Sequence, residues 1–446
     1  MVPMLRRFRR AVDVGALNDS GLGYLAAACK RGGAEVILLS WNVNHDRKTL
    51  GEKLAEFRPD IVGLKVFTTL FNECRETLRC VRSVVPGAVT IIGGPHPSTS
   101  RPEDLFAEFD GLLDFAMAGD AEVGMVALIE KIVSCGGKPG GDALSSIPGL
   151  IYRDGDEVRK NEPCVDMELD SLAPLDWSLQ QPRWFGANHG VDEANVGALV
   201  LDSRGCSASC GFCKSSGING SIPRKRSLKL LCGEIEELAR DYGVRVLVFT
   251  GNAFMSDVDY VRELCEWFMG FDYPLKWTCT GAAWEGNLRD RGLLDLMRRA
   301  GCTLIHYGIE SGNSAVRRRL RQPTPLEECT ELVKLTAEAG IRPACYFMFG
   351  HPHETVEEMN DTIKYAFSLP YHSVSLYICL PLPGTSAYEA VLEKYGLDRI
   401  DWSTYDFANP KLLPCTASLG QLRRKFFEAR VLRKSRVARQ IYRFIH

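Results

Sequence analysis

The sequence predicts an α/β protein in which a Rossmann-like, doubly wound domain precedes a partial (β/α)6 TIM-like barrel and a C-terminal helical segment. Short apolar runs alternate with amphipathic helical runs over the first 135 residues and again from about residue 195, a pattern typical of parallel sheets. A stretch rich in glycine and proline separates the two series. The second series holds six strand–helix units in about 185 residues, which is fewer than the eight of a closed barrel of about 250 residues.

The first domain is expected over residues 1–136. Its runs are short, continuous and apolar, as in strands that are buried on both faces. The predicted strands are residues 34–39, 60–67, 88–92 and 113–117, with a weaker first strand at 11–17. Because ligands of such sheets bind at the carboxyl ends of the strands, three loops are candidate binding loops. They are residues 68–70, 93–97 and 119–122.

A linker with a small hairpin is expected over residues 137–194, since this segment is rich in turn residues and shows no sustained period. The hairpin strands are predicted at residues 150–152 and 158–160. The composition therefore marks a break between the two series of strand–helix units.

The partial barrel is expected over residues 195–395, and a helical region over residues 396–446. The predicted barrel strands are residues 196–202, 244–250, 275–280, 303–309, 344–349 and 373–380. The predicted barrel helices are residues 228–239, 258–268, 293–300, 326–339 and 355–367. The last segment, residues 421–446, carries nine Lys or Arg, one Glu and interspersed apolar residues. This mixture favours a helix packed on the barrel over a phosphate-binding tail.

Composition restricts the classes of partner. The 446 residues carry 54 basic and 56 acidic side chains, a net charge of −2, so neither nucleic acid nor an anionic membrane is an expected partner. The basic first ten residues lack the apolar core of a secretory signal, and no apolar run approaches the roughly 18–20 residues of a membrane span. We therefore expect a cytoplasmic protein, in which clustered members of the 16 cysteines bind metal or do chemistry.

The cysteines at positions 206, 210 and 213 form a C-x3-C-x2-C run directly after the first predicted barrel strand. Active sites of barrels lie at the carboxyl ends of their strands. Three thiolates on Cys206, Cys210 and Cys213 can hold a four-iron cluster and leave one iron open for a substrate or cofactor. No fourth Cys or His follows at zinc-finger spacing, and Cys232 falls on the apolar face of the next predicted helix. An incomplete zinc knuckle or three incidental buried thiols are the alternatives.

These three cysteines, with the aromatic Phe212 between them, resemble the cluster motif of the radical S-adenosylmethionine superfamily. Further segments resemble the motifs of this superfamily in the same order along the chain. They are RKRS at residues 224–227, TGNAF at 250–254, GIESG at 308–312, FGHPHET at 349–355 and PLPGT at 381–385. The resemblance spans about 180 residues and implies a 4Fe–4S cluster and bound S-adenosylmethionine.

The resemblance also implies roles for particular residues. The segment Thr250, Gly251 and Asn252 would meet the methionyl amine, Glu310 the ribose, and Gly350 the adenine, with Arg226 leading into the first barrel helix. A carboxylate at a strand end can accept hydrogen bonds from two hydroxyl groups, and glycine lets the backbone approach a ligand. The alternatives are a salt-bridged cap acid for Glu310, a turn glycine for Gly350 and a solvated face for Arg226.

In the first domain, Thr68-x-Leu70 and Gly93-Gly94 resemble two of the three signatures of cobalamin-binding domains. The wider sequence resembles the N-terminal domain of cobalamin-dependent radical S-adenosylmethionine enzymes, which implies cobalamin contacts in the same loops. The remaining implied contacts are Pro95, His96 and Gly119. The third signature, D-x-H-x-x-G, is absent, so no histidine is expected on the lower face of the cobalt. The alternative is a domain that has lost its ligand.

Weaker signals lie within the barrel strands. Cys279, Cys345 and Cys379 could bind a second cluster, although packing is the favoured interpretation because thiols are commonly buried. His306 and Tyr307 are adjacent on the fourth strand, so one of them is expected to face the barrel interior. Tyr307 is predicted to be a catalytic proton or hydrogen donor, with core filling as the alternative.

The resemblance implies that a reduced cluster cleaves S-adenosylmethionine to a 5′-deoxyadenosyl radical, which removes hydrogen from an unactivated carbon of a small metabolite. It further implies an external one-electron reductant such as flavodoxin or ferredoxin, and methyl transfer through methylcobalamin. The alternatives are non-methylating radical chemistry (rearrangement, cyclisation or sulfur insertion) without cobalamin, a transfer-RNA methylthiotransferase, and a non-enzymatic metal-binding protein. No motif identifies the substrate.

Overall fold

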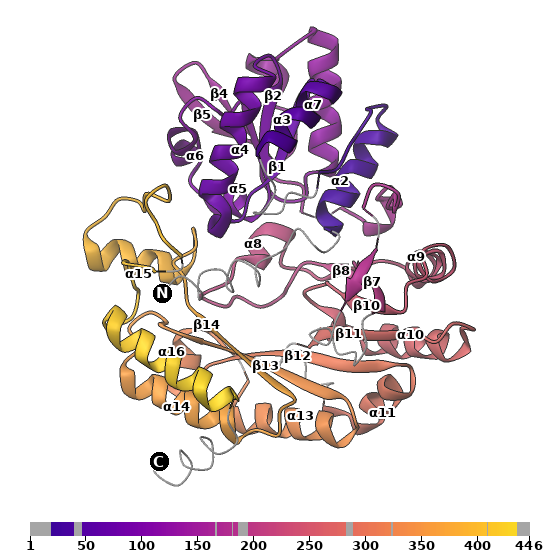
Figure 1. The fold of residues 1–446 in the computed structure, drawn as a ribbon, viewed down its shortest axis with the longest axis vertical. Coiled ribbons are helices and arrows are strands. Elements are labelled where there is room, and N and C mark those ends of the chain that lie inside the picture. The colour runs from indigo at the N-terminus through magenta and orange to yellow at the C-terminus, as the bar shows by residue number, and fades with distance from the viewer. Residues whose placement is uncertain are drawn as a thin grey trace. The chain divides into compact units, whose positions relative to one another are not determined.

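The computed structural model describes residues 19–39, 47–165, 167–180, 182–185, 195–281, 289–322, 324–407 and 409–434. The chain divides into two compact units (Figure 1). Unit 1 comprises Met1–Gln181, Ser215–Ser221 and Ile400–Ala408, and unit 2 comprises Pro182–Lys214, Ile222–Arg399 and Asn409–His446. Each unit therefore contains segments that are distant in the sequence.

Unit 1 is built on a five-stranded sheet in the order β1-β2-β3-β4-β5. The strands are β1 (Ile61–Lys65), β2 (Val89–Gly93), β3 (Phe115–Met117), β4 (Leu150–Asp154) and β5 (Glu157–Lys160). The first three are parallel, as the sequence predicts, and β4 and β5 form the predicted hairpin. The hairpin extends the sheet, because β4 pairs antiparallel with β3 and Leu150, Ile151 and Tyr152 are buried.

One predicted strand is wrong. Residues 34–39 form no strand, and Ile37 and Leu39 are exposed. An apolar run is compatible with a strand, but a strand also needs a neighbouring backbone with which to pair, and pairing is set by the tertiary structure. The weaker strand expected at residues 11–17 lies outside the described residues.

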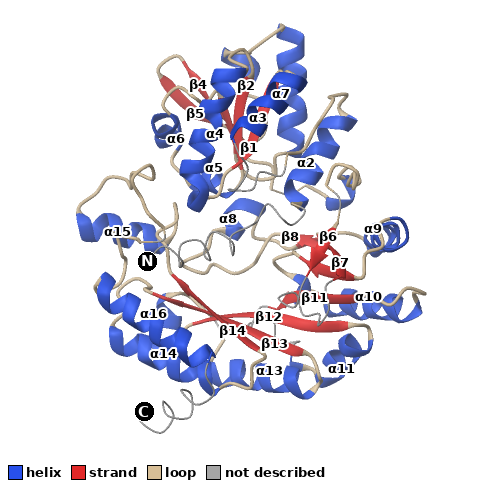
Figure 2. Cartoon of the chain, in the orientation of Figure 1, coloured by secondary structure: helices blue, strands red, loops and turns tan. Residues whose placement is uncertain are grey.

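Helices cover the sheet of unit 1 on both faces (Figures 1 and 2). They are α2 (Ser20–Arg31), α3 (Arg47–Phe57), α4 (Phe71–Val84), α5 (Pro95–Thr99), α6 (Pro102–Phe109) and α7 (Glu122–Cys135), whereas the short α8 (Ser215–Asn219) contacts α5 and has no buried residue. Their apolar faces bury one cluster that includes Ile91, Phe115, Leu128 and Leu150, and a second around Leu50, Leu54 and Val81. The burial of these faces on the sheet is the main stabilising term of the unit.

Unit 2 contains a seven-stranded sheet in the order β14-β13-β12-β11-β10-β7-β6. Six of these strands are parallel and confirm the six predicted barrel strands, whereas β6 is antiparallel to β7. The strands are β6 (Arg183–Phe185), β7 (Asn195–Val200), β10 (Val246–Phe249), β11 (Lys276–Gly281), β12 (Cys302–Glu310), β13 (Arg342–Phe349) and β14 (Ser373–Ile378). A separate two-stranded ribbon pairs β8 (Ser203–Arg204) with β9 (Arg224–Lys225).

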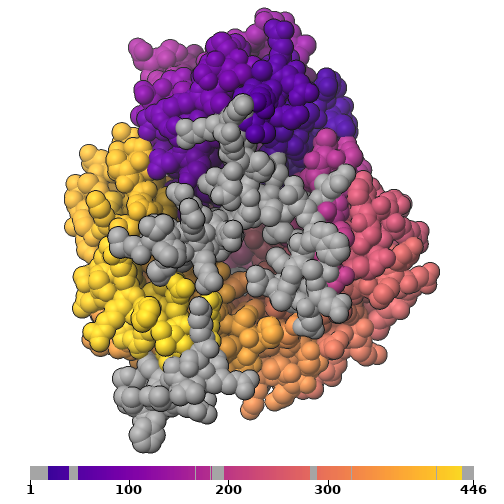
Figure 3. Space-filling view, viewed as in Figure 1, coloured from indigo at the N-terminus to yellow at the C-terminus, as the bar shows by residue number. Residues whose placement is uncertain are grey.

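The described helices of unit 2 are α9 (Leu228–Asp241), α10 (Val258–Gly270), α11 (Arg291–Arg299), α12 (Ser314–Arg319), α13 (Leu326–Glu338), α14 (Val356–Ser368), α15 (Ser386–Tyr395) and α16 (Leu419–Lys434). Of these, α10, α11, α13 and α14 lie along the outer side of the curved sheet, as in an open barrel (Figure 2). The five predicted barrel helices are confirmed, and α12 and α15 are additional. Helix α16 confirms a helix within the basic C-terminal segment and is part of the yellow surface in Figure 3. No helix among the described residues has the length and apolar character needed to span a bilayer.

A glycine pair in unit 1 provides a test of the hairpin attachment. Gly149 has φ +69°, and a Cβ there would lie 2.3 Å from the carbonyl oxygen of Ala118, whereas Gly155 in the hairpin turn has φ +63° and open space. A left-handed conformation costs an L-residue about 1–2 kcal/mol at either position. We expect Gly149→Ala to lower the free energy of unfolding by at least about 2 kcal/mol more than Gly155→Ala, because backbone atoms must move. Urea unfolding followed by tryptophan fluorescence measures both, and equal losses would contradict the packing described for β3 and β4.

Candidate active site

The three cysteines lie on the loop that follows β7, at the carboxyl end of that strand. Cys210 is buried, and Cys206 and Cys213 are partly exposed. The loop turns tightly, because the Cys213 amide donates to the Cys210 carbonyl at 3.1 Å. The Gln322 amide nitrogen (Nε2) lies 3.2 Å from Cys210 Sγ and donates to it, a contact that the sequence did not indicate.

The thiols influence one another electrostatically. Burial, followed by the charges of Cys213, Cys206 and Glu310, raises the pKa of the Cys210 thiol to about 12. The four groups are therefore close enough to interact, and a metal that binds Cys210 must displace its proton. Among the described residues, no group of three or more His, Cys, Asp and Glu side chains is gathered tightly enough to hold a metal ion. In an iron–sulfur cluster each cysteine binds a different iron. The sulfur atoms of the three cysteines therefore need not converge on one point.

A buried carboxylate anchors the loops next to the cysteines. Asp202 Oδ1 accepts the Gly251 amide at 3.0 Å, and Oδ2 accepts the Ser203 hydroxyl at 2.8 Å. A Cβ at Gly251 would lie 2.4 Å from this carboxylate, so glycine is needed there to make room for Asp202. The amide and the hydroxyl of Thr250 both donate to the Val200 carbonyl, and Asn252 is exposed. The Gly251 amide is thus already engaged by Asp202.

The side chain of Arg226 is buried, so it does not lie on a solvated face. Its guanidinium is buried and forms an ion pair with Glu234 of α9 at 2.5 Å, and it also donates to the Leu201 carbonyl at 3.2 Å. Both contacts connect the first barrel helix to the end of β7. A cofactor contact of Arg226 stays a prediction, and the structure adds a positioning contact that spacing along the chain did not reveal.

Glu310 lies at the carboxyl end of β12, where the pairing with β13 shifts by one residue. Its backbone is left-handed, with φ +69°. The carboxylate folds over the neighbouring glycine, since a Cβ at Gly308 would lie 2.6 Å from Glu310 Oε1. Burial raises the pKa of Glu310 to about 7, and the charge of Arg317 opposes this rise. The strained backbone and the poised carboxylate are typical of a binding site.

The segment after β13 contains buried polar groups. Glu354 Oε2 accepts the amides of Gly350 at 2.6 Å and His351 at 3.0 Å. Glu354 Oε1 and both ring nitrogens of His351 have no hydrogen-bond partner among the described residues. The His351 ring lies 6.2 Å from the Phe212 ring of the cysteine loop. Burial lowers the pKa of His351 to about 4, so its ring is neutral at physiological pH.

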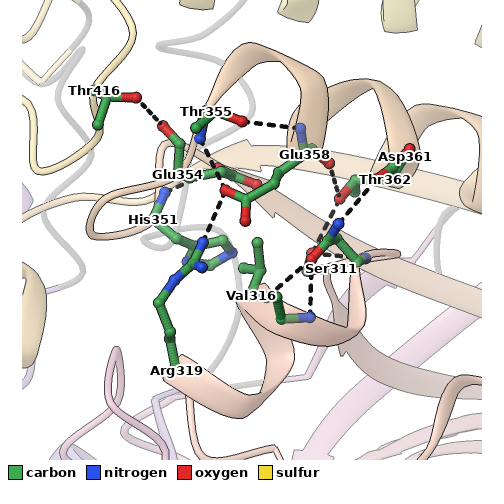
Figure 4. Close-up of polar contacts among 12 residues, drawn as sticks. Ser311, Val316, Arg319, His351, Glu354, Thr355, Glu358, Asp361, Thr362 and Thr416 are labelled. Atoms are coloured by element: carbon green, nitrogen blue, oxygen red, sulfur yellow. Dashed lines mark hydrogen bonds and ion pairs between the residues drawn. The ribbon is translucent and has the colours of Figure 1, made fainter.

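A hydrogen-bond network holds this segment in place (Figure 4). Thr355 begins α14 with a capping box, in which its hydroxyl accepts the Glu358 amide and the Glu358 carboxylate accepts the Thr355 amide. Glu358 also forms an ion pair with Arg319 of α12 at 2.8 Å. The Glu354 carbonyl accepts the Thr416 hydroxyl at 2.8 Å. The capping box of α14, the ion pair with α12 and the hydrogen bond from Thr416 therefore hold this segment in place.

The predicted role of Tyr307 requires correction. Its hydroxyl lies 2.8 Å from Thr336 Oγ1 of α13, so the side chain points into the helix layer and is fully buried. Since side chains alternate along a strand, His306 lies on the opposite, inner face. His306 Nδ1 lies 2.6 Å from the hydroxyl of Tyr346, which shares this face from β13. The sequence could predict that one of the pair faces inward but not which.

The remaining barrel cysteines are buried as packing residues. Burial raises the pKa of Cys279, beside Cys302, and of Cys345, beside Cys329, a residue of α13. These neighbours place both thiols on the helix side of the sheet. Burial also raises the pKa of Cys379, which is near Glu354 and Cys415. Packing is therefore the interpretation that the structure supports for these thiols.

In unit 1, Thr68 and His96 form part of a buried polar chain. Thr68 Oγ1 lies 3.0 Å from His96 Nδ1, and His96 Nε2 lies 3.3 Å from Glu108 Oε2. The rings of Phe71 and Trp402 pack on His96. Both ring nitrogens of His96 are thus engaged by protein. Glu108 belongs to none of the sequence motifs described above, so its contact with His96 could not be predicted.

The other residues implied in cobalamin binding lie at the carboxyl ends of β1–β3. Leu70 ends a short 3-10 helix, Pro95 begins α5, and Gly93 pairs with Lys65 of β1. Gly94, at φ +95°, and Gly119, at φ +74°, are crowded by protein: a Cβ would lie 3.0 Å from Lys65 Cγ and 2.8 Å from Pro163 Cβ, respectively. The backbone conformation and these contacts explain both glycines without a ligand.

Comparisons with known proteins agree with this arrangement. The family model described as the radical SAM superfamily matches residues 200–366, and the model described as the B12 binding domain matches residues 7–129. The chain therefore carries a radical SAM domain and, before it, a B12-binding domain. The first match includes the cysteine loop, Glu310 and Gly350, and the second includes Thr68, His96 and Gly119.

Several relatives align over most of the chain. An uncharacterised methyltransferase of Pyrococcus horikoshii is 24% identical over 95% of this chain and 89% of its own length. The cytidylyl-2-hydroxyethylphosphonate methyltransferase of Streptomyces wedmorensis is 27% identical over 85% of this chain and 78% of its own. The anaerobic magnesium-protoporphyrin IX monomethyl ester cyclase of Cereibacter sphaeroides is 25% identical over 92% of this chain and 65% of its own.

Two solved structures share the fold. The radical S-adenosylmethionine methyltransferase TsrM from Kitasatospora setae, with cobalamin and a 4Fe–4S cluster bound, has a TM-score of 0.67 and 20% identity, over 92% of this chain and 79% of its own. The cobalamin-dependent enzyme OxsB, with aqua-cobalamin bound, has a TM-score of 0.65 and 18% identity, over 80% of this chain and 51% of its own. At these identities, both similarities concern the fold.

Gly308 provides a test of the position of Glu310. We expect Gly308→Ala to displace the Glu310 carboxylate, because the new Cβ would meet its oxygen at 2.6 Å, and to weaken S-adenosylmethionine binding at least tenfold. The fold should lose no more than about 1 kcal/mol, since the end of a flexible side chain can move. Equilibrium dialysis on the anaerobic, cluster-loaded protein gives the dissociation constant. Gly233→Ala on α9, where nothing lies within 4 Å, is the control, and unchanged binding in Gly308→Ala would contradict the role of Glu310.

Glu354 gives a pH-dependent test of the same loop. Burial raises the pKa of Glu354 from 4.5 to about 7, so between these values the folded state holds a proton that the unfolded state releases. The free energy of unfolding should therefore fall as pH rises from 5 to 8, and Glu354→Gln should remove on the order of 2 kcal/mol of this fall. Urea unfolding at several pH values measures the slope.

Glu358→Gln is the matched control for this test. Although burial opposes it, the hydrogen bond from Arg319 lowers the pKa of Glu358, so its ionised form stabilises the fold. The loss in Glu358→Gln should grow as pH rises toward about 4.5 and stay constant above it, so this variant should keep the fall between pH 5 and 8 that Glu354→Gln reduces. The same slope in both variants would contradict the assignment of Glu354 as the buried, protonated acid.

Proposed function

We propose that the chain is a cobalamin-dependent radical S-adenosylmethionine enzyme that methylates an unactivated carbon of a small metabolite. The observation that carries the proposal is the placement of Cys206, Cys210 and Cys213 at the carboxyl end of a parallel half-barrel, within electrostatic reach of Glu310. Parallel barrels hold their reactions at this edge. The N-terminal B12-binding domain supports the methyl-transfer outcome.

The residues fit the implied groups. Buried polar atoms on His351 and Glu354 lack partners next to the cysteine loop, as in a site that a polar ligand completes. When bound, the cluster and S-adenosylmethionine supply a one-electron cleavage that yields a carbon radical, and cobalamin supplies a methyl group. Cys206, Cys210 and Cys213 would hold the cluster, and the Glu310 carboxylate would accept the ribose hydroxyls. Asp202 and Arg226 would hold the loops around them.

The loops at the ends of β1–β3 would hold cobalamin. Thr68 is oriented by His96, and His96 by Glu108, so that a hydroxyl rather than an imidazole is presented at the end of β1. His96 would therefore orient Thr68 within the loop rather than bind the cofactor directly. An external one-electron reductant such as flavodoxin or ferredoxin is part of the proposal, because each reductive cleavage of S-adenosylmethionine consumes one electron.

Relatives support two outcomes of the radical chemistry. A phosphonate methyltransferase, the hopanoid C-3 methylase of Methylococcus capsulatus and TsrM, which has been determined with tryptophan bound, favour methyl transfer to carbon. The magnesium-protoporphyrin cyclases favour ring formation instead. Non-methylating chemistry without cobalamin is therefore the second candidate. The substrate class remains a small molecule in either case.

Anaerobic reconstitution tests the cluster. We expect the wild-type protein, purified without oxygen and supplied with iron and sulfide, to be brown, with a broad absorption near about 400 nm from iron–sulfur charge transfer. Cys210→Ala should lose this absorption and the formation of 5′-deoxyadenosine from S-adenosylmethionine. Cys232→Ala, at a buried thiol on α9, should retain both. A colourless protein that binds zinc in air would contradict the proposal.

Loading with hydroxocobalamin separates the two outcomes. The methyltransferase proposal expects about one bound cobalt per chain, measured by elemental analysis after gel filtration. The electron paramagnetic resonance spectrum of the Co(II) form should show the same nitrogen splitting in His96→Gln as in the wild type. No stoichiometric cobalt, together with unaltered formation of 5′-deoxyadenosine, would contradict methylation and leave the non-methylating alternative.

A further inference from the structure

A tyrosine and a histidine form a hydrogen-bonded pair on the inner face of the half-barrel. The Tyr346 hydroxyl lies 2.6 Å from His306 Nδ1, and the two rings stack at 5.4 Å with an angle of 18° between their planes. With a neutral imidazole, the phenol is the donor and Nδ1 the acceptor. Burial, followed by the neighbouring Tyr377, raises the pKa of Tyr346 to about 12, so the phenol keeps its proton at physiological pH.

The strand register places this pair next to the proposed nucleoside site. Tyr346 of β13 pairs with Gly308 of β12, and Glu310 lies two residues further along the same face of β12. Gly308 contributes no side chain between Tyr346 and the Glu310 carboxylate, which lies over this glycine. Tyr346 is partly exposed, whereas Tyr307 of β12 is fully buried against α13. Of these two phenols, Tyr346 is therefore the one that a ligand inside the barrel can reach.

A phenol can give its O–H hydrogen to a carbon radical as a hydrogen atom, which leaves a neutral phenoxyl. The imidazole nitrogen at 2.6 Å, which accepted the hydrogen bond of the phenol, can then take up a proton from solvent. The protonated nitrogen can donate a hydrogen bond to the phenoxyl and return the proton when the oxygen is reduced. A packing role needs a ring in this place, but it does not need a donor hydroxyl paired with a base.

We propose that Tyr346 is the hydrogen-atom donor of the site and that His306 manages its proton. The proposal rests on the proposed function, since it needs the 5′-deoxyadenosyl radical. When this radical finds no substrate, its 5′ carbon forms a C–H bond with the hydrogen of the Tyr346 O–H bond, which breaks to leave a neutral phenoxyl. One electron from the external reductant and one proton through His306 restore the phenol. The pair thus quenches stray radicals before they damage the barrel.

Isotope transfer in heavy water tests this assignment without a known substrate. The cluster-loaded protein is equilibrated in D2O and given S-adenosylmethionine and titanium(III) citrate as the reductant. Mass spectrometry then gives the deuterium content of the 5′-deoxyadenosine. We expect mainly monodeuterated product from the wild type, because the phenolic hydrogen exchanges with solvent, and at least a threefold lower deuterium fraction from Tyr346→Phe.

Two controls separate Tyr346 from the other phenols. Tyr307→Phe removes the hydroxyl that contacts Thr336, and Tyr377→Phe removes one from the ring that packs edge-on against Tyr346 at 5.9 Å. Both should retain the wild-type deuterium fraction. His306→Phe, which keeps a ring but removes the base, should lower that fraction and provides a second variant if Tyr346→Phe folds poorly. Freeze-quenched wild-type samples should show a tyrosyl resonance that narrows when ring-deuterated tyrosine is incorporated.

The outcomes are distinct. A wild-type deuterium fraction retained in both Tyr346→Phe and His306→Phe overturns the hydrogen-donor role, while the proposed function stands because 5′-deoxyadenosine is still formed. Unlabelled product from the wild type overturns it as well. If the wild type forms no 5′-deoxyadenosine, the proposed function fails, and this inference fails with it.

Discussion

The alternation of side chains along parallel strands is the constraint on which the site of unit 2 depends. Each barrel strand is packed by helices on one face and lines the half-barrel with the other, so adjacent residues have opposite surroundings. On β12, Tyr307 contacts Thr336 in the helix layer, whereas His306 pairs with Tyr346 on the inner face. Between Gly308 and Glu310 the pairing with β13 shifts by one residue and the Glu310 backbone becomes left-handed, while the Glu310 carboxylate stays on the face of Gly308. The acid of the site is therefore placed by a local exception to a regular sheet.

Buried polar contacts complete the organisation that the sheets begin. In unit 2, the carboxylate of Asp202 ties the end of β7 to the loop after β10, and the pair of Arg226 and Glu234 ties it to α9. In unit 1, Glu108 orients His96, and His96 orients Thr68. Such charges are costly to bury unless they are paired, so each contact restricts the position of a loop more strongly than apolar packing would. Both units thus present rigid strand-end loops, on which cofactors with demanding chemistry can be held.

Much of the fold follows from local patterns. Six barrel strands, five barrel helices and three parallel strands of unit 1 were predictable, because period and run length are properties of neighbouring residues. The errors arise where pairing decides the outcome. Residues 34–39 are apolar and yet form no strand, and the hairpin of β4 and β5 joins the sheet of unit 1 through β3. Residues 215–221, which lie within the barrel sequence, belong to unit 1 by their contacts.

The sequence by itself determined that two strand series exist. It also predicts a cluster site at the carboxyl ends of the second series, since the spacing of Cys206, Cys210 and Cys213 is set within eight residues of chain. Only the tertiary structure decided which residues support these groups. Gln322 meets Cys210 across more than a hundred residues, and Glu108, His351 and Tyr346 gain their importance from partners on other elements. Contacts of this kind depend on how strands align and which face each side chain takes, and neither is a property of a short segment.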